Sequence, residues 1–382
     1  MLDRQVAQLV RSLCSPRPDP GIADFGLDRL REAVAHAEGH GLAPLLACAL
    51  NRMDAGFSLV ESAESGSSAE TVLARAYLQT LGHNLRVKAA LRELDVELAA
   101  LGLSGVLWKG GHLIHGVYPD PGMRPMEDVD ILVPARYRPG FETALSNLGY
   151  RPGAGHPGLW RNRNVVVDMA GDAVNSDRIP ARLAVIPLTA ETVRDRARPL
   201  PGYSSLLVPC PVDTVVLLAV HAMKHGFARD IWLADGIWFL DRLGDACPPA
   251  EVSRRAIGTG STLAVGTWLA LMRQWPRCDS LWPGYTATPE KQGMLAGSLV
   301  RRTLEQGPSA DLGELFFLAS CTTWKQRTAY VKDTLLPPRA TIEQLYPGGL
   351  FPWWARYPRR TLDLARMGFY AARARSGPGS GE

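Results

Sequence analysis

Two aspartates stand at the start of a short apolar run, Asp128-Val129-Asp130-Ile131-Leu132-Val133. The β-branched residues and the proline that follows predict a β-strand. Residues two apart in a strand point to the same face, so Asp128 and Asp130 are expected side by side while Val129 and Ile131 face a core. Two like charges at that separation repel one another, and a divalent cation bridging them would remove the conflict. This run therefore predicts both a sheet and a metal site.

A third carboxylate, Asp168, lies within another apolar run, residues 164–169, which also predicts a strand. An unpaired charge inside an apolar strand is costly. If the two strands are neighbours, three carboxylates converge, and a ligand set of oxygens alone suits Mg²⁺ or Mn²⁺. Glu127 and Asp172 are the substitutes if the register differs by one residue or by a turn.

Gly110 and Gly111 follow a predicted strand at residues 106–108 and precede a helical pattern at residues 112–118. Glycines at a strand-to-helix turn let a phosphate approach the backbone. The start of the helix adds unpaired N–H groups and the positive end of the helix dipole. The pair predicts a phosphate site, and a tight turn that needs positive φ is the structural alternative.

Two basic residues, Lys109 and Arg124, flank these motifs. They are expected either to bind triphosphate oxygens, Arg124 through its bidentate fork, or to neutralise the carboxylate cluster before a metal arrives. The sequence leaves both alternatives open.

Three predicted strands alternate with helical patterns in the middle of the chain, which predicts an α+β fold. We expect a small mixed-sheet core at residues 96–200, between a helical N-terminal region (1–95) and a helical C-terminal region (201–375), with a disordered tail at 376–382. The helical patterns cover residues 27–37, 69–101, 141–148, 212–225, 230–243 and 262–275, and residues 54–68 are a predicted loop.

Composition narrows the class of protein. Of 382 residues, 42 are basic and 38 acidic, and the net charge of +4 is too even to indicate nucleic-acid or membrane binding. No uncharged apolar run approaches the ~18 residues of a membrane helix, and the N-terminal MLDRQVAQLV lacks the apolar centre of a signal peptide. Six cysteines without a CxxC pair argue against a disulfide framework or a structural zinc site. These features predict a cytoplasmic protein without a membrane partner.

A glycine-glycine turn, an Asp-x-Asp strand and a later single aspartate in a strand resemble the signature of the nucleotidyltransferase superfamily, whose fold is that of DNA polymerase beta. The fuller set of motifs is similar to the bacterial "nucleotidyltransferase family protein" group. That set comprises Lys109-Gly110-Gly111, Tyr118, Arg124 and the Asp128–Val133 strand, with HGLAPLL from His40 and His221-x-x-x-His225 followed by Asp235.

The resemblance implies transfer of a nucleoside monophosphate from an NTP, ATP being favoured, to a hydroxyl, amine or phosphate, with release of pyrophosphate. Gly110 and Gly111 would hold the triphosphate, and Asp128 and Asp130 would ligate two Mg²⁺ ions. Asp168 would ligate the catalytic metal and act as, or assist, the base. Gly111 departs from the serine usual in the family, so a hydroxyl contact to phosphate is lost. Relatives often accompany natural-product biosynthesis genes, which favours a small-molecule or peptide acceptor.

His221 and His225 lie one helical turn apart, as zinc ligands can, but no third ligand is evident. A helix packed behind the active site is the expected alternative, with His221, Lys224 or His225 near the nucleotide or the acceptor.

Two other functions remain: a toxin-type transferase that modifies tRNA or a protein, and a non-catalytic scaffold. The basic, aromatic segment 353–375 is the only support for the first, and the near-neutral charge makes a nucleic-acid partner unfavourable.

Overall fold

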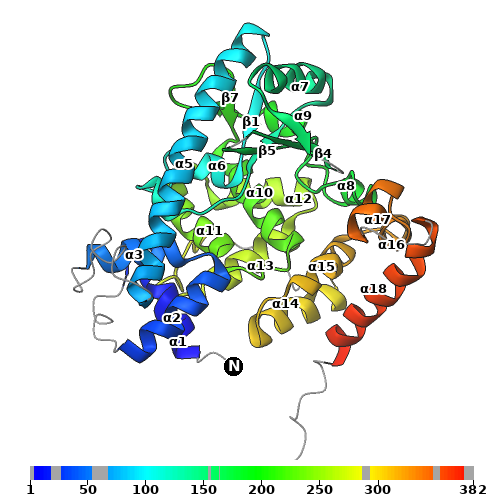
Figure 1. The fold of residues 1–382 in the computed structure, drawn as a ribbon. Helices are drawn as coiled ribbons and strands as arrows, with labels where there is room; N and C mark the ends of the chain where they lie inside the picture. The colour runs from blue at the N-terminus through cyan, green and yellow to red at the C-terminus, as the bar shows by residue number, and fades with distance from the viewer. Residues whose placement is uncertain are drawn as a thin grey trace, which may run out of the picture.

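The computed structural model describes residues 4–18, 27–53, 68–153, 156–162, 164–285, 293–346 and 353–373. Helices flank a seven-stranded mixed sheet, so the predicted α+β class is confirmed. Figure 1 shows the sheet in the upper part of the molecule, with the long helix α5 (Ala69–Ala100) running beside it down to the N-terminal helices. The helices that follow the sheet in the chain lie below it and at the lower right.

The strands of the sheet are arranged in the order β3-β4-β5-β2-β1-β7-β6. β2 pairs in parallel with β5 and antiparallel with β1, and β1 pairs in parallel with β7. The expected strands correspond to β1, β2 and β5, whereas the other four, three of which contain proline, carry no clear alternation and were not expected. The bounds are β1 (Gly105–Leu107), β2 (Val129–Leu132), β3 (Arg151–Gly153), β4 (His156–Arg161), β5 (Val166–Ala170), β6 (Arg198–Pro199) and β7 (Leu206–Val208).

One face of the sheet is apolar and is covered by α5 and α7 (Arg138–Asn147). Ile131 of β2 is buried there among side chains that include Leu91 of α5 and Phe141 of α7. Since side chains alternate along a strand, Asp130 points to the opposite face. The periodicity of the strand therefore separates a core face from a face that carries the carboxylates.

The opposite face lies toward the C-terminal helices. Val106 and Leu132 belong to a second core together with apolar residues of α10 and α13. The predicted helix at residues 230–243 is confirmed to the residue, and the pattern at residues 262–275 ends three residues early, at Met272. The helices on this side are α10 (Pro211–Lys224), α11 (Asp230–Leu243), α12 (Pro249–Gly258) and α13 (Thr262–Met272).

The remaining helices surround these elements, and α14 to α18 form the lower right part of Figure 1. No helix within the described ranges is long and apolar enough to cross a bilayer. The predicted loop at residues 54–68, apart from Ser68, and the tail at residues 376–382 lie outside the described residues. These helices are α1 (Arg4–Leu13), α2 (Leu27–His40), α3 (Ala43–Arg52), α6 (Lys109–Leu113), α8 (Ala181–Val185), α9 (Ala190–Arg194), α14 (Met294–Gln306), α15 (Gly313–Ser320), α16 (Trp324–Leu335), α17 (Arg339–Leu345) and α18 (Arg356–Arg373).

The helix expected at residues 112–118 is wrong in its bounds. It begins at Lys109 and ends at Leu113, so the glycine pair lies inside the first turn of α6 and not ahead of it. Trp108 is extended, and Lys109 has a φ of 50°, in the left-handed region. The sharp change of direction is therefore made at Lys109. Gly110 and Gly111 are not needed for a positive φ at this turn.

Candidate active site

Three carboxylates converge on the sheet face that α5 does not cover. Asp130 of β2 and Asp168 of β5 are register partners in the parallel pairing, and Asp128 comes immediately before β2. One carboxylate oxygen from each of the three side chains lies within 4.8 Å of the other two. The structure thus brings together the three residues that the sequence predicted as metal ligands.

Burial and like charge raise the pKa of these carboxyl groups. Burial, with the charge of Asp130 close by, raises the pKa of Asp128 to about 6, and the same two causes raise the pKa of Asp168. The Lys109 ammonium donates a hydrogen bond to Asp130 and offsets part of the repulsion. For Lys109 the structure therefore shows the ion pair that was one of the two alternatives.

The donor set fits a hard divalent cation. It consists of carboxylate oxygens alone, and the three carboxylates outnumber the nearby Lys109 and Lys224 ammonium groups, so the cluster carries an excess of negative charge. The two substitute residues are placed differently: Glu127 is exposed, and Asp172 accepts hydrogen bonds from the backbone N–H of Val174 and from the hydroxyl of Ser176. Neither joins the cluster.

The two glycines have different surroundings. A Cβ atom on Gly110 would lie 3.2 Å from the Met126 side chain, at the edge of the cavity described below. A Cβ atom on Gly111 would lie 2.7 Å from Cδ1 of Leu107, a buried residue of β1. Gly110 therefore lies in the cavity wall, against Met126 and Arg124, whereas Gly111 permits α6 to pack closely on the sheet. A serine in place of Gly111 would bring its Cβ atom against Leu107.

A cavity of about 340 Å³ opens beside Asp128 and Asp130. Its walls come from the α6 turn, the segment before β2, the end of α10 and the start of α11. One part is charged, and another is formed by apolar and aromatic side chains. The lining residues are Lys109, Gly110, Arg124, Pro125, Met126, Glu127, Asp128, Asp130, His221, His225, Arg229, Ile231 and Trp232.

A second cavity, of about 460 Å³, borders Asp168, which does not line the first one. Gly158 of β4 is also in its wall, and a Cβ atom there would lie 3.2 Å from Oδ1 of Asp168. The carboxylate cluster therefore stands between two cavities.

Arg124 is engaged by a single carboxylate. Its Nε and Nη2 atoms each donate to Asp235 at 2.7 Å, and the Tyr118 hydroxyl donates to the same carboxylate at 2.9 Å. Arg124 and Asp235 are both buried, so this fork joins the segment before β2 to α11. In the structure the guanidinium thus pairs with Asp235 and not with the three carboxylates, and a contact of Arg124 with the nucleotide stays a prediction.

The C-terminal end of α10 presents His221, Lys224 and His225 toward the site. Burial, together with the charges of Lys109 and Lys224, lowers the pKa of His221 well below its usual value, and burial with Lys224 lowers that of His225 to about 3. Both rings are therefore neutral near pH 7. Neither belongs to a group of metal-ligating side chains among the described residues, which leaves zinc binding without support.

Lys224, the last residue of α10, contacts the loop that follows β5. Its ammonium donates to Oδ1 of Asn175 at 2.7 Å, and Asn175 lines the second cavity. Burial and the nearby Lys109 lower the pKa of Lys224 to about 7. Lys224 therefore links the end of α10 to a residue in the wall of the second cavity.

Five residues of the first cavity were not predicted from the sequence: Pro125, Met126, Arg229, Ile231 and Trp232. Arg229 and Trp232 both line the first cavity, from the start of α11, and Trp232 packs against His225 with ring centroids 5.0 Å apart. The local signal for Arg229 and Trp232 was only their place next to and within the start of the predicted helix 230–243, and that position does not indicate that this end of α11 meets the α6 turn.

A family model described as "Uncharacterised nucleotidyltransferase" matches residues 29–276. That range includes the carboxylate cluster, the first cavity and helices on both sides of the sheet. No curated protein and no solved structure matches the chain.

Proposed function

The chain belongs to the uncharacterised nucleotidyltransferase family, and on that premise we propose that it moves a nucleoside monophosphate from an NTP to a small-molecule or peptide acceptor. The observation that carries the proposal is the convergence of Asp128, Asp130 and Asp168 beside a cavity. ATP is the favoured nucleotide. Residues 96–200 would form the transferase core, between the helical regions 1–95 and 201–375.

The three carboxylates would hold Mg²⁺ or Mn²⁺. Bound there, the metal supplies charge stabilisation for the transferring phosphoryl group and for the leaving pyrophosphate. Lys109, which neutralises Asp130 in the structure, would then be released toward the nucleotide phosphates. The same lysine would then serve both of its predicted roles, one without the nucleotide and one with it.

The reaction needs the acceptor to lose a proton as its oxygen or nitrogen attacks the α-phosphorus, while the bond to the β-phosphate oxygen breaks. Asp168 would be the carboxylate that accepts that proton or assists in its removal. It borders the second cavity, and Asp128 and Asp130 border the first. We therefore assign the first cavity to the nucleotide and the second to the acceptor.

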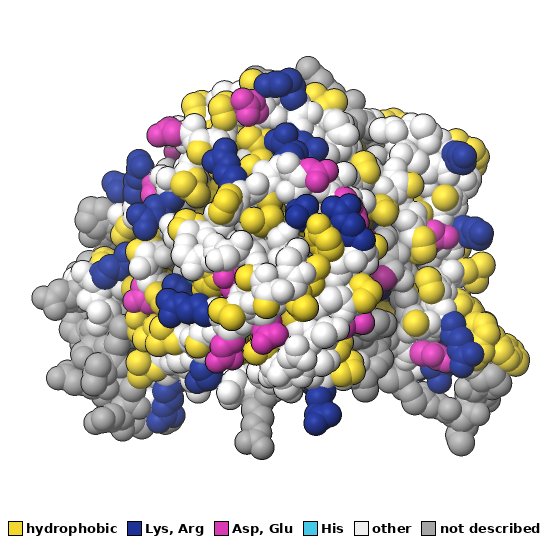
Figure 2. All heavy atoms as spheres, turned by 90° about the horizontal axis from the view of Figure 1, so that it is seen from above, with side chains coloured by type: hydrophobic (Ala, Val, Ile, Leu, Met, Phe, Trp, Pro, Cys, Tyr) yellow, Lys and Arg dark blue, Asp and Glu magenta, His cyan; other side chains and the backbone are white. Residues whose placement is uncertain are grey.

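The size of the second cavity favours a small acceptor or the end of a peptide. Figure 2 shows that basic and acidic side chains are interspersed on the upper face of the molecule, and that face carries no continuous basic surface of the kind that nucleic acids need. The aromatic, basic segment 353–375 lies largely on the exposed helix α18, and the side chains of residues 366–375 lie outside the described residues.

The test is label transfer from α-³²P-labelled ATP in the presence of Mg²⁺ and a host-cell extract divided into small-molecule, protein and RNA fractions. The expected result is label in the small-molecule or peptide fraction, and none with the Asp130→Asn or Asp168→Asn variants. Label on RNA or a protein would favour the toxin-type alternative. Absence of transfer by a protein that binds ATP would favour the scaffold.

A further inference from the structure

The first cavity holds three basic side chains, and two of them are already paired. Lys109 pairs with Asp130 and Arg124 pairs with Asp235, whereas Arg229 makes no hydrogen bond or ion pair within the part of the chain that the structure describes. Its guanidinium instead lies 6.0 Å from the ring centroid of Trp232. A half-buried guanidinium in the wall of a cavity has an unused planar fork, which matches the oxygens of a phosphate group.

We propose that Arg229 binds the polyphosphate of the nucleotide, and that Asp230, held by Arg11, His36 and His40, sets its position. The inference rests on the proposed function for the nature of the ligand. The inference adds Arg229 as a binding residue. It also adds positioning residues from α1 and α2, two helices that do not border the carboxylate cluster.

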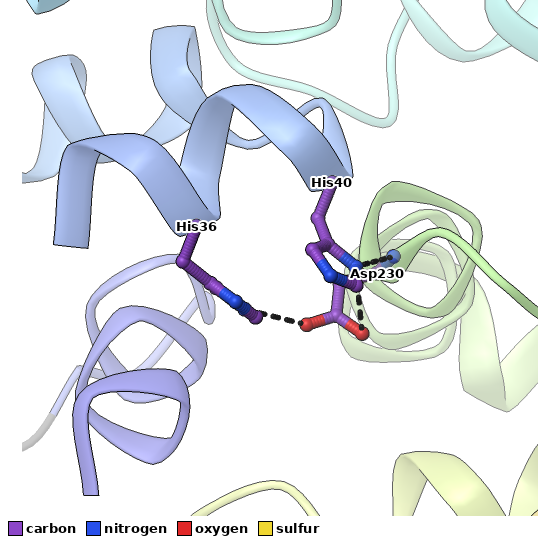
Figure 3. A group of neighbouring side chains, drawn as sticks. All are labelled: His36, His40 and Asp230. Atoms are coloured by element: carbon purple, nitrogen blue, oxygen red, sulfur yellow. Dashed lines mark hydrogen bonds and ion pairs between the residues drawn. The ribbon is translucent and has the colours of Figure 1, made fainter. Parts of the chain in front are cut away.

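Asp230 is 1% exposed and is contacted by side chains of α1 and α2. Figure 3 shows the two histidines of α2, His36 and His40, beside its carboxylate. Arg11 of α1 donates to both of its oxygens, at 2.9 and 3.1 Å. His36 of α2 lies 3.2 Å from Oδ2, and the Asp230 backbone N–H donates to Nδ1 of His40 at 3.3 Å. These contacts hold the pKa of Asp230 well below its usual range, although burial acts in the opposite direction.

Two histidines and an aspartate with ligand atoms within 4.8 Å of one another also resemble a metal site. The hydrogen bonds argue against it. The Arg11 fork places a positive charge against both oxygens of Asp230, and the lone pair of Nδ1 on His40 already accepts the Asp230 N–H. A divalent cation would have to displace both the Arg11 guanidinium and the Asp230 N–H. The cluster is better explained as a set of structural contacts, here called the joint, in which Arg11, His36 and His40 hold Asp230 and so connect α1, α2 and the start of α11.

The same joint borders Arg229 directly. Gly41, which follows His40 at the end of α2, has a φ of 74°, and a Cβ atom there would lie 2.8 Å from Nη2 of Arg229 and 3.3 Å from Ile231. Arg229 precedes Asp230 in the chain and lines the cavity with its Nη2 atom near Gly41, while the Asp230 carboxylate pairs with the N-terminal helices. The end of α2 therefore fixes the start of α11 on one side and confines the Arg229 guanidinium on the other.

The direct test compares ATP with AMP in equilibrium titrations of the full chain with Mg²⁺. We expect Arg229→Gln to weaken ATP binding about tenfold or more and to leave AMP binding within about twofold, because only ATP carries the β- and γ-phosphates. Arg254→Gln, at an exposed position of α12, is the matched control and is expected to bind both nucleotides as the wild type does. Equal losses for ATP and AMP, or no loss, would overturn the assignment of Arg229.

The positioning role is tested at His36. His36→Leu removes the hydrogen bond to Asp230 and is expected to lower ATP affinity several-fold without affecting AMP, whereas His36→Gln keeps an N–H donor and restores it. A loss of thermal stability without a change in ATP affinity would make the joint purely structural. If ATP affinity depends on Arg229 but no transfer occurs, the inference stands and the transferase function fails; if the wild type does not prefer ATP to AMP, the inference fails.

Discussion

Asp130 and Asp168 are direct partners in the parallel pairing of β2 with β5. Two carboxylates placed opposite one another on neighbouring strands repel each other. Lys109 forms an ion pair with Asp130, and the charges of Lys109 and Lys224 offset only part of the repulsion at Asp168. The arrangement therefore lowers stability without a metal, as is typical of sites that are organised for chemistry.

The first prediction concerns the proposed base. Asp168→Asn keeps the shape of the side chain and removes its charge and basicity. We expect ATP binding within a few-fold of wild type and a loss of transfer of about a hundredfold or more, the size typical of a lost general base. Single-turnover transfer from labelled ATP measures the loss. Asp128→Asn is the comparison, because both binding and turnover are expected to fall there; normal turnover by Asp168→Asn would remove Asp168 from the mechanism.

Removal of metal should weaken nucleotide binding. Asp128 and Asp130 repel ATP phosphates as well as one another unless a cation lies between them, so EDTA is expected to reduce ATP affinity by at least about tenfold at pH 8. Protons compete with the metal at Asp128, whose pKa is raised to about 6, so the gain from Mg²⁺ should shrink below that pH. Calorimetry across pH 5 to 8 checks both effects, and equal affinity with and without EDTA would contradict the metal site.

The raised pKa of Asp128 also predicts a pH dependence of stability. A folded pKa of about 6 against an ordinary value of 3.8 means that the folded state binds the proton more tightly, so the ionised group destabilises the metal-free protein above pH 6. The penalty disappears as the pH falls from about 6 to 4. Asp128→Asn should therefore raise the free energy of unfolding by about 1 to 2 kcal/mol at pH 8, allowing for partial exposure, and have no effect below about pH 4. Urea denaturation at both pH values measures the difference; a variant less stable than wild type at pH 8 would show that the carboxylate is not strained.

The glycine pair should separate into a packing role and a binding role. Gly111→Ala places a Cβ atom 2.7 Å from Leu107 and is expected to cost about 1 to 3 kcal/mol of stability, with Leu107→Val as a relieving second substitution. Gly110→Ala places its Cβ atom 3.2 Å from the Met126 side chain and 3.5 Å from Nη1 of Arg124, so it should cost less stability than Gly111→Ala and weaken ATP binding by narrowing the cavity. Denaturation and ATP titration of the two variants provide the comparison, and a stable Gly111→Ala variant would refute the packing explanation.

The buried pair Arg124–Asp235 should be more important for stability than for binding. Asp235→Ala leaves a buried guanidinium without its fork partner, at an expected cost of about 3 to 5 kcal/mol. The double variant Arg124→Met/Asp235→Leu removes both charges and should recover much of that loss. Thermal unfolding of the single and double variants decides, and equal destabilisation by both would argue against an unpaired charge as the cause.

The sequence by itself determined what depends on local periodicity. Alternation along residues 128–133 put Asp128 and Asp130 on one face and apolar side chains on the other, and the 3.6-residue period of α11 fixed its bounds. It also provided the elements of an α+β fold. Strands such as β6, two residues that include a proline, have no period to detect, and they form because β7 offers a neighbour to pair with.

Only the tertiary structure decided which distant residues share the site. The convergence of Asp168 with the Asp-x-Asp pair follows from β2 pairing with β5 rather than with another strand, and strand order is set by the packing of the whole sheet. The sequence does not indicate which basic residue pairs with Asp235. The structure shows that Arg124 does, because α11 lies against the segment before β2. Arg229 carried no motif at all. Ion pairs and cavity walls are made by groups far apart in the chain, and no local period encodes such contacts.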